Sequence, residues 1–268
     1  MKKIILCIAL AISFFKGYSQ SLIEEYRECA SQHFYHQEFE QCLDYFNRII
    51  KLYPNDSTAY NDRGQIKEFL KDYKGAIEDY TKEISIDTTF ADSYFFRGMA
   101  EQKTKLYASA IIDFTKTIKY EAKNSDAYYF RGQCNVALNQ MDGVLNDYNM
   151  ALKLRPDHAE VYADRGWLEM HFNNDKKAVI DFNKALQFDT NCAQAYYYKA
   201  LLFIKKKDFK SALNNINKAI DITMNNAAYF ATRSTINQAL HKSKEACNDI
   251  NRCLELDPNY NIPKINCN

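Results

Sequence analysis

Five residues that recur along the chain decide the fold: Tyr60-Asn-Asp-Arg-Gly64, Tyr94-Phe-Phe-Arg-Gly98, Tyr128-Tyr-Phe-Arg-Gly132 and Tyr162-Ala-Asp-Arg-Gly166. The step between them is 34 residues each time. The same step leads forward to Tyr196 with Ala200 and to Phe230 with Ser234, and backward to Tyr26 with Ala30. Seven units therefore cover residues 23–260 without an insertion. Their bounds are 23–56, 57–90, 91–124, 125–158, 159–192, 193–226 and 227–260.

A second set of residues repeats in the later half of each unit. Position 20 is alanine in five units, and position 24 is apolar in all seven. Pro54, Pro156 and Pro258 stand at position 32, where proline ends a helix. Each unit thus has two apolar stripes, which predicts two helices per unit. The small number of glycines and prolines, 7 and 4 in 268 residues, also favours an all-α chain.

The period resembles the tetratricopeptide repeat, which has an aromatic residue at position 4, small residues at positions 8 and 20, an aromatic at 24 and proline at 32. The resemblance covers nearly all of the chain after residue 22. It implies an all-α, right-handed superhelical solenoid of seven helix-turn-helix repeats with an inner groove. In each repeat we expect Gly64, Gly98, Gly132 or Gly166 on helix A to face the position-20 residue of helix B.

The first nineteen residues have the three parts of a signal peptide. Lys2 and Lys3 precede an apolar run over residues 4–15, and Gly17 and Ser19 precede a predicted cut before Gln20. The run is too short to span a bilayer. We therefore expect a bacterial protein exported to the periplasm or the cell exterior, with residues 20–22 as a lead-in and 261–268 as a C-terminal tail.

Charge gives no indication of nucleic acid or membrane binding. The chain has 35 bases and 34 acids, and cleavage would remove three lysines and no acid. The mature chain would then have 35 − 3 = 32 bases against 34 acids and be close to neutral. We expect no nucleic-acid partner and no membrane span after the signal is removed.

Arginine at position 7 and aspartate at position 23 occur together, which predicts a structural ladder of ion pairs within the repeats. The alternative is a set of independent solvent-facing charges. The predicted pairs are Arg63 with Asp79, Arg97 with Asp113, Arg131 with Asp147, Arg165 with Asp181 and Arg233 with Asp249.

The first repeat carries cysteines and histidines that allow three interpretations. Cys29, His33 and His36 share a helical face, and Cys42 on the opposing helix would complete a zinc-like ligand set. A Cys29–Cys42 disulfide would suit an exported protein, and reduced core cysteines are the third possibility. The mature chain keeps seven cysteines, an odd number, and Cys267 in the tail is placed to pair with Cys247 or Cys253.

The groove is the expected partner-binding site. In this family, positions 2, 5, 6, 9, 12 and 13 of helix A face inward, and their spacing places them on one side of the helix. We predict an aromatic and acidic groove that holds extended peptides or a partner helix. Its predicted residues are Phe95, Phe96, Met99, Tyr129, Phe130, Trp167, Tyr197 and Tyr198, with the acids Asp92, Asp126, Glu160 and Asp164. Ring packing between repeats is the alternative for part of this set.

The sequence favours a non-enzymatic scaffold that binds a polypeptide with apolar anchors and basic flanks. It lacks a phosphate-binding loop, a G-x-S-x-G nucleophile turn and an H-E-x-x-H metal motif, and we expect no cofactor. Two alternatives stay open: a metal-binding or redox module in the first repeat, and a structural subunit of an envelope complex. The sequence does not fix the oligomeric state.

Overall fold

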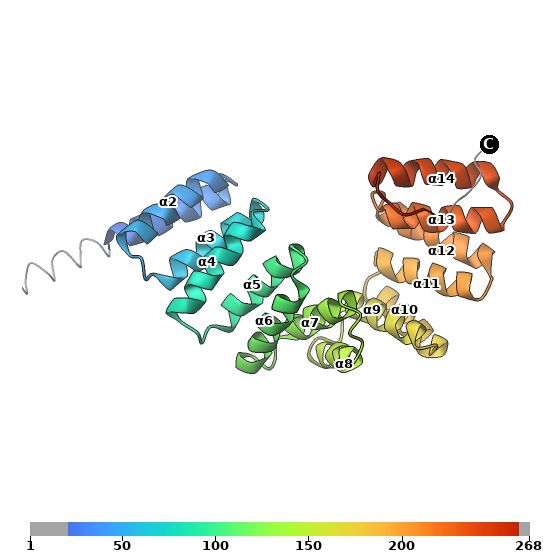
Figure 1. The fold of residues 1–268 in the computed structure, drawn as a ribbon, viewed down its shortest axis with the longest axis horizontal. Coiled ribbons are helices and arrows are strands. Elements are labelled where there is room, and N and C mark those ends of the chain that lie inside the picture. The colour runs from blue at the N-terminus through green and yellow to red at the C-terminus, as the bar shows by residue number, and fades with distance from the viewer. Residues whose placement is uncertain (1–20, 263–268) are drawn as a thin grey trace, which may run out of the picture. The chain divides into compact units, whose positions relative to one another are not determined.

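The computed structural model describes residues 21–262 and shows them as antiparallel helices joined by short turns (Figure 1). These residues form no strand. Residues 21–35 are helical and precede the thirteen helices α2 to α14. Their bounds are α2 Phe39–Leu52, α3 Ser57–Phe69, α4 Tyr73–Ile86, α5 Ala91–Lys103, α6 Tyr107–Tyr120, α7 Ser125–Ala137, α8 Val144–Leu154, α9 Ala159–His171, α10 Asp175–Phe188, α11 Ala193–Lys205, α12 Phe209–Ile222, α13 Ala227–Ala239 and α14 Ser243–Leu256.

The predicted all-α fold of helical hairpins is confirmed. From the second repeat onward, helix A begins at the first residue of the 34-residue unit, as α3 does at Ser57 and α13 at Ala227. Helix B ends before Pro54, Pro156 and Pro258, because proline cannot continue the helical hydrogen bonding. The predicted signal peptide, residues 1–19, and the tail from residue 263 lie outside the described residues.

The chain divides into two compact units, with the boundary after Val144, the first residue of α8. Each unit is described separately below. Unit 1 contains residues 21–35 and α2 to α7, and unit 2 contains the rest of α8 and α9 to α14. Helix α8 has 11 residues, whereas the other B helices have 14, and it begins three positions later in its repeat. Gly143, with a φ of 81°, holds the chain out of helical conformation just before it.

The turn from helix A to helix B is the same in all seven repeats. The residue at position 15 is left-handed in each, with φ between 58° and 63°, and none of the seven is glycine. In repeat two, Asp72 N–H donates to the Lys67 carbonyl and Lys71 N–H donates to the Glu68 carbonyl, a Schellman arrangement that satisfies the last carbonyls of helix A. The other six repeats have equivalent hydrogen bonds.

The sequence predicts that glycine at position 8 faces the residue at position 20, but the nearest atoms belong to the ring at position 24. A Cβ built on Gly166 would lie 2.6 Å from Phe182 Cε1 and 3.2 Å from the Ala178 carbonyl oxygen, and one on Gly64 would lie 2.7 Å from Tyr80 Cε1. Glycine at position 8 is therefore required mainly by the buried ring at position 24, which lies on its α-carbon, and less by the alanine at position 20.

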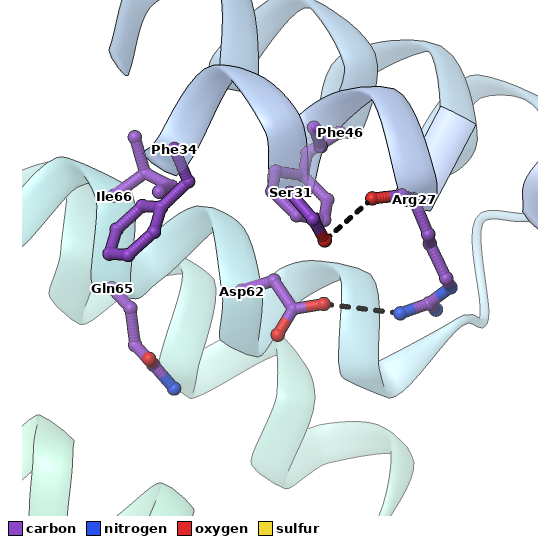
Figure 2. Close-up of a pocket in the computed structure, with 8 residues that line it drawn as sticks. Arg27, Ser31, Phe34, Phe46, Asp62, Gln65 and Ile66 are labelled. Atoms are coloured by element: carbon purple, nitrogen blue, oxygen red, sulfur yellow. Dashed lines mark hydrogen bonds and ion pairs between the residues drawn. The ribbon is translucent and has the colours of Figure 1, made fainter. Parts of the chain in front are cut away.

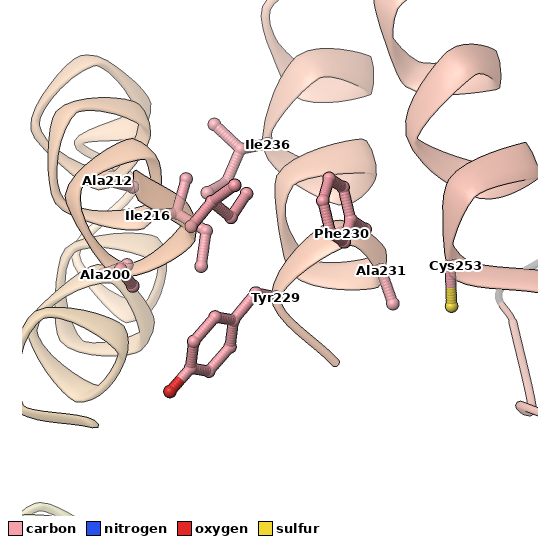
Figure 3. Packing of buried hydrophobic residues seen from close by; sticks show 10 residues of the cluster. Ala200, Ala212, Ile216, Tyr229, Phe230, Ala231, Ile236 and Cys253 are labelled. Carbon is pink, nitrogen blue, oxygen red and sulfur yellow. The ribbon is translucent and has the colours of Figure 1, made fainter. Parts of the chain in front are cut away.

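Small and large apolar side chains alternate in the core of unit 2. Ala200 and Ala212 let α11 and α12 approach, and Ile216 and Ile236 fill the space around them (Figure 3). Tyr229 and Phe230 are more than nine-tenths buried and extend the cluster to α13. Such a core is continuous between neighbouring hairpins, since a single hairpin cannot bury its apolar face.

The arginine–aspartate ladder is present within both units. Arg97 donates from Nε to Asp113 Oδ2 at 2.6 Å and from Nη2 to Oδ1 at 2.8 Å, and the aspartate is buried. Arg63 with Asp79, Arg165 with Asp181 and Arg233 with Asp249 make the same fork-to-fork pairs. Arg131 and Asp147 lie in different units. A bidentate pair around a buried carboxylate is a structural element, in contrast to isolated surface charges.

Each ladder arginine also reaches back to the preceding repeat. Its Nη1 donates to the polar residue at position 25, at 2.7 Å for Arg63 to Asn47 and at 3.1 Å for Arg97 to Thr81. Arg131 donates in this way to Thr115, Arg165 to Asn149 and Arg233 to Asn217. The guanidinium lies over the ring at position 4, 5.5 Å away for Arg63 over Tyr60. One side chain thus joins two repeats.

Repeat six is the exception in unit 2. Lys199 stands in place of the arginine and donates to Asn183 of the preceding repeat at 3.1 Å. Position 23 is Asn215, whose amide donates to the Ser211 carbonyl. Burial, with a smaller effect of Lys218, lowers the pKa of Lys199, since no carboxylate compensates its charge.

Candidate partner-binding face

The helix-A face, formed by positions 2, 5, 6, 9, 12 and 13 of helix A, contains a cavity in unit 1. The cavity has a volume of about 380 Å³ and lies between helix 21–35 and α3 (Figure 2). Arg27, Ser31 and Phe34 line it from the first helix, and Asp62 and Gln65 from α3, all at helix-A face positions. Ala30, Phe46 and Ile66 complete the lining. Phe34 and Ile66 make one end of the cavity apolar, and Arg27 and Asp62 make the other end charged. Such a cavity could hold an apolar side chain of a peptide together with its neighbouring polar backbone.

An ion-pair network fixes the charged end. Arg27 Nη1 donates to Asp62 at 3.1 Å, and its Nη2 donates to both oxygens of Asp56 at 2.8 and 2.9 Å (Figure 2 shows the bond to Asp62). Asp56 in turn caps α3 by accepting from the Ala59 N–H. Burial raises the pKa of Asp62, and Arg27 opposes that rise. Arg27 divides its positive charge between Asp62 and Asp56, so the Asp62 carboxylate could also accept a basic group of a partner.

Two exposed rings adjoin the cavity, and the sequence prediction did not include them. Phe34 is 42% exposed and Phe69 58% exposed, although their ring centroids lie only 5.3 Å apart. Phe39 stacks on Phe69 at 5.4 Å. Phe34 and Phe69 occupy positions 12 and 13, which belong to the inward set. The prediction concentrated on repeats three to six, and applying the same positions to repeats one and two would have found them.

The predicted groove rings of unit 1 are less accessible than expected. Phe95 packs against Phe96, Phe114 and Phe130 with ring centroids 5.8 to 6.0 Å apart, and Phe114 is fully buried. Phe95, Phe96, Met99 and Phe130 are half-buried. Tyr129 is buried, and its hydroxyl accepts from Gln133 at 2.7 Å. Packing between successive hairpins, the alternative interpretation, applies to the buried Tyr129, whereas the half-buried Phe95, Phe96, Met99 and Phe130 keep part of their surface accessible.

In unit 2 the predicted rings form one connected group. Trp167 on α9 stacks on the exposed His171 at 5.7 Å and lies 6.2 Å from Tyr198 on α11. Tyr197 pairs with the buried Tyr229 of the next repeat at 4.9 Å. Trp167, Tyr197 and Tyr198 are half-buried, so each presents one part of its ring to a partner.

The predicted acids differ in their environments. Asp92 and Glu160 are exposed and Asp126 is half-buried. Asp164 is buried and accepts hydrogen bonds from Gln194 and the Tyr198 hydroxyl. Its predicted role as a groove charge is therefore wrong, since its carboxylate holds α11 against α9.

The first repeat does not contain the predicted disulfide: Cys29 and Cys42 are both free thiols. Helix register explains the difference. The Cys42 thiol is buried and donates to the Ala30 carbonyl at 3.2 Å, so position 20 faces position 8. Cys29 at position 7 lies beside Tyr45 at position 23, where other repeats place arginine and aspartate. The two sulfurs therefore belong to different contacts across the hairpin.

The alternative ligand set of Cys29, His33, His36 and Cys42 does not converge. His33 Nδ1 pairs with Glu38 at 2.5 Å, and its ring stacks on Tyr45. Within residues 21–262 there is no group of three or more histidine, cysteine or acidic side chains arranged to hold a metal ion. In unit 2, Cys247 is disulfide-bonded and Cys253 is free. Cys267 lies outside the described residues.

Comparisons with known proteins agree with this fold. The family model described as tetratricopeptide repeat matches residues 57–90 and 193–226, which are repeats two and six with the bounds given above. Tetratricopeptide repeat protein 36 of Danio rerio is 46% identical over 44 residues. That match covers 16% of this chain and only 24% of the relative.

Solved structures extend the likeness to the whole fold. A tetratricopeptide repeat protein from Parabacteroides merdae has a TM-score of 0.77 and 16% identity, and the match covers 89% of this chain and 94% of that one. YrrB, described as a repeat protein with an unusual peptide-binding site, has a TM-score of 0.56 and 23% identity, with 74% and 97% covered. MamA has a TM-score of 0.60 and 21% identity, with 65% and 94% covered. Two of the seven repeats thus match the tetratricopeptide-repeat model, and the fold as a whole is that of a tetratricopeptide-repeat solenoid.

No helix within residues 21–262 combines the length and the apolar character that a membrane crossing requires.

Proposed function

We propose that this protein is a scaffold that binds a polypeptide partner on its helix-A face, with the principal anchor site in the cavity of unit 1. The supporting observation is the juxtaposition of that cavity with the exposed rings of Phe34 and Phe69. Exposed aromatic side chains beside a cavity are typical anchor sites of protein interfaces. We assign no reaction and no cofactor to the protein.

The partner we propose has an apolar anchor followed by a basic residue. The apolar side chain would enter between Phe34, Phe46 and Ile66, and the basic group would meet Asp62 and the exposed Glu28. YrrB, a structural neighbour, is described as having a peptide-binding site, which supports a peptide ligand for this fold. In unit 2 the same preference would apply to Trp167 beside Glu160, which is exposed.

Selection of random peptides on the purified protein tests the proposal. We expect enriched peptides to carry an aromatic or aliphatic residue next to lysine or arginine. A Phe34→Ala, Phe69→Ala double variant should lose their binding by roughly tenfold or more, since two anchors are removed. Tyr120→Ala is the matched control, because Tyr120 is 41% exposed on α6, a B helix, and does not line the cavity. Equal binding by all three proteins would contradict the anchor site.

Helix B offers a second surface, which belongs to the structural-subunit alternative. Ile112 on α6 and Ile180 on α10 are 62% and 56% exposed, and both stand at position 22. An Ile112→Asp, Ile180→Asp variant that loses partner capture, while the Phe34 and Phe69 variant keeps it, would favour that alternative.

We also propose export to the periplasm or the cell exterior. The support is the basic start, the apolar run and the small residues before Gln20. Mass spectrometry of the protein from the extracytoplasmic fraction should find Gln20 as the first residue. An intact Met1 in the cytoplasm would contradict it.

A further inference from the structure

The ladder aspartate receives a third hydrogen bond in some repeats, from position 11 of helix A. In repeat two, Lys67 Nζ lies 2.8 Å from Asp79 Oδ2. In repeat seven, the Asn237 amide donates to Asp249 Oδ2 at 2.9 Å. Position 11 of repeat three is Glu101, an acceptor when ionised, and the charge of the ladder carboxylate Asp113 acts on it.

Glu101 is a buried carboxyl group whose neighbouring arginine is already paired with another carboxylate. It is 8% exposed, and its Oε2 accepts no hydrogen bond from residues 21–262. Arg97 on the same helix is committed elsewhere, with Nε and Nη2 on Asp113 and Nη1 on Thr81. Ionised Glu101 would thus place a second buried carboxylate beside one guanidinium.

Burial and a neighbouring carboxylate together outweigh the one arginine that acts on Glu101. Burial and the charge of Asp113 on α6 raise the pKa of Glu101 to about 7, and Arg97 opposes the rise. Cys134 on α7 remains a neutral thiol, because burial raises its pKa to about 12. Within residues 21–262, Arg97 and Asp113 are the charges that act on Glu101.

We propose that Glu101 is a proton-binding site of the folded chain: a proton on its buried carboxyl group removes the second negative charge near Asp113, where repeats two and seven have a lysine or an amide. The protonated oxygen is a donor and Asp113 keeps its negative charge for Arg97. The site exists only in folded unit 1, because an unfolded Glu101 is solvated and ionises as an ordinary glutamate.

Repeat five shows what distinguishes this site. Its position 11 is also a buried glutamate, Glu169, but Asn174 donates to Glu169 Oε2 at 2.7 Å and Lys177 Nζ lies 3.7 Å from Oε1. Repeat three has Leu106 and Ser109 in the corresponding positions. Glu169 therefore has protein donors for its negative charge, whereas Glu101 requires a proton.

The proposal gives unit 1 a pH dependence of definite sign. A carboxyl group with a folded pKa above its unfolded value binds more protons in the native state between the two values. The contribution of this group to stability is then highest below the unfolded value of about 4.3, decreases as the pH rises to about 7, and is constant at higher pH. Through this group, unit 1 is therefore more stable in mild acid, where Glu101 is protonated, than at pH values above 7, where it is ionised.

Carbon-13 NMR titration of glutamate carboxyl groups in the full chain tests the site directly, with Glu101→Gln used to assign its signal. We expect Glu101 to titrate between pH 6 and 8. A midpoint near 4.5, the ordinary value for glutamate, would overturn the proposal.

Thermal melts of three proteins at pH 5.5 and 8.5 provide the second test. Relative to wild type, Glu101→Gln should raise the melting temperature more at pH 8.5 than at pH 5.5, by on the order of 5 °C. Glu169→Gln, the matched control, should show no such gain. Leu106→Asn supplies the donor that repeat five has and should lower the NMR midpoint of Glu101. An unchanged midpoint in Leu106→Asn together with equal pH slopes in wild type and Glu101→Gln would overturn the proposal.

Discussion

The residue at position 8 matches the size of the side chain at position 24 in repeats two to seven, whereas repeat one combines Ala30 with the buried ring of Phe46. Glycine occurs with the buried rings of Tyr80, Phe114 and Phe182, which lie directly on it. In repeats six and seven, Ala200 and Ser234 occur with isoleucine at position 24, which leaves room for a Cβ. The two positions behave as one packing unit, because overlap at fixed backbone spacing is costly.

Substitution of Gly166 by alanine should therefore destabilise unit 2, and part of the loss should depend on Phe182. We expect about 1–3 kcal/mol from overpacking, since the new methyl group would lie within 3 Å of the ring. Adding Phe182→Ile should recover part of this loss relative to Phe182→Ile alone. Urea denaturation of the four proteins measures the coupling, which we expect to be on the order of 1 kcal/mol. Additive effects would show that the ring can move aside.

Trp167 is the residue at which binding and stability are best separated. Its ring stacks on the exposed His171, so the alanine variant should keep most of the fold and lose an anchor worth about 2 kcal/mol of binding, roughly 30-fold in Kd. Peptide titration and a thermal melt check the two effects. His171→Ala is the matched control for the stacking partner. A large loss of stability with unchanged binding would make Trp167 a core residue.

The sequence identified which side chains share the helix-A face, but it did not fix their burial. The position of a residue in the 34-residue period determines the side of the helix on which its side chain lies. How much of that side chain is exposed depends on how the neighbouring hairpin packs against it. Tyr129 is buried under Gln133, and Asp164 is held by Tyr198, although both stand at inward positions. Of the three interpretations of the first repeat, free thiols are found and the Cys29–Cys42 disulfide is not, because proximity in a hairpin does not specify which side chains meet.

At the scale of the element, the 34-residue period predicted the start of helix A but missed the late start of α8. Asp142-Gly143 is a turn signal inside a segment that other repeats use as helix, and it removes the first turn of helix B. The division into two units falls at this point. A strict period describes an average repeat, so local departures from it must be read residue by residue.

The ladder predicts how repeat six can be strengthened. Lys199 has no carboxylate partner, and Asn215 binds its own helix instead. The double variant Lys199→Arg, Asn215→Asp restores the pattern of the other repeats and should stabilise unit 2 by about 1 kcal/mol or more. Asn215→Asp alone should gain less, since lysine cannot make the bidentate pair. Chemical denaturation of the single and double variants measures the difference, and no gain in the double variant would contradict a stabilising role of the pair.

At the scale of the whole molecule, the thiols report on integrity in both units. Burial raises the pKa of Cys42, Cys134, Cys192 and Cys253, to about 12 for Cys134. A buried neutral thiol is a poor nucleophile, so these four should resist a thiol reagent at pH 8, and the half-buried Cys29 should react first. Mass spectrometry of labelled peptides identifies the sites. Rapid labelling of Cys134 or Cys253 in native protein would contradict the described packing.

Within each unit, a ladder arginine such as Arg97 has one partner sixteen residues ahead, Asp113, and another sixteen residues behind, Thr81. The two distances are the same whatever the number of repeats in the chain. A coding segment for one repeat, copied in tandem, would give a new arginine whose two partners are already at the correct distance. The gene can therefore lengthen or shorten by whole repeats without an intermediate that carries an unmatched buried charge, and Lys199 with Asn215 shows that a repeat can also lack both members of the pair.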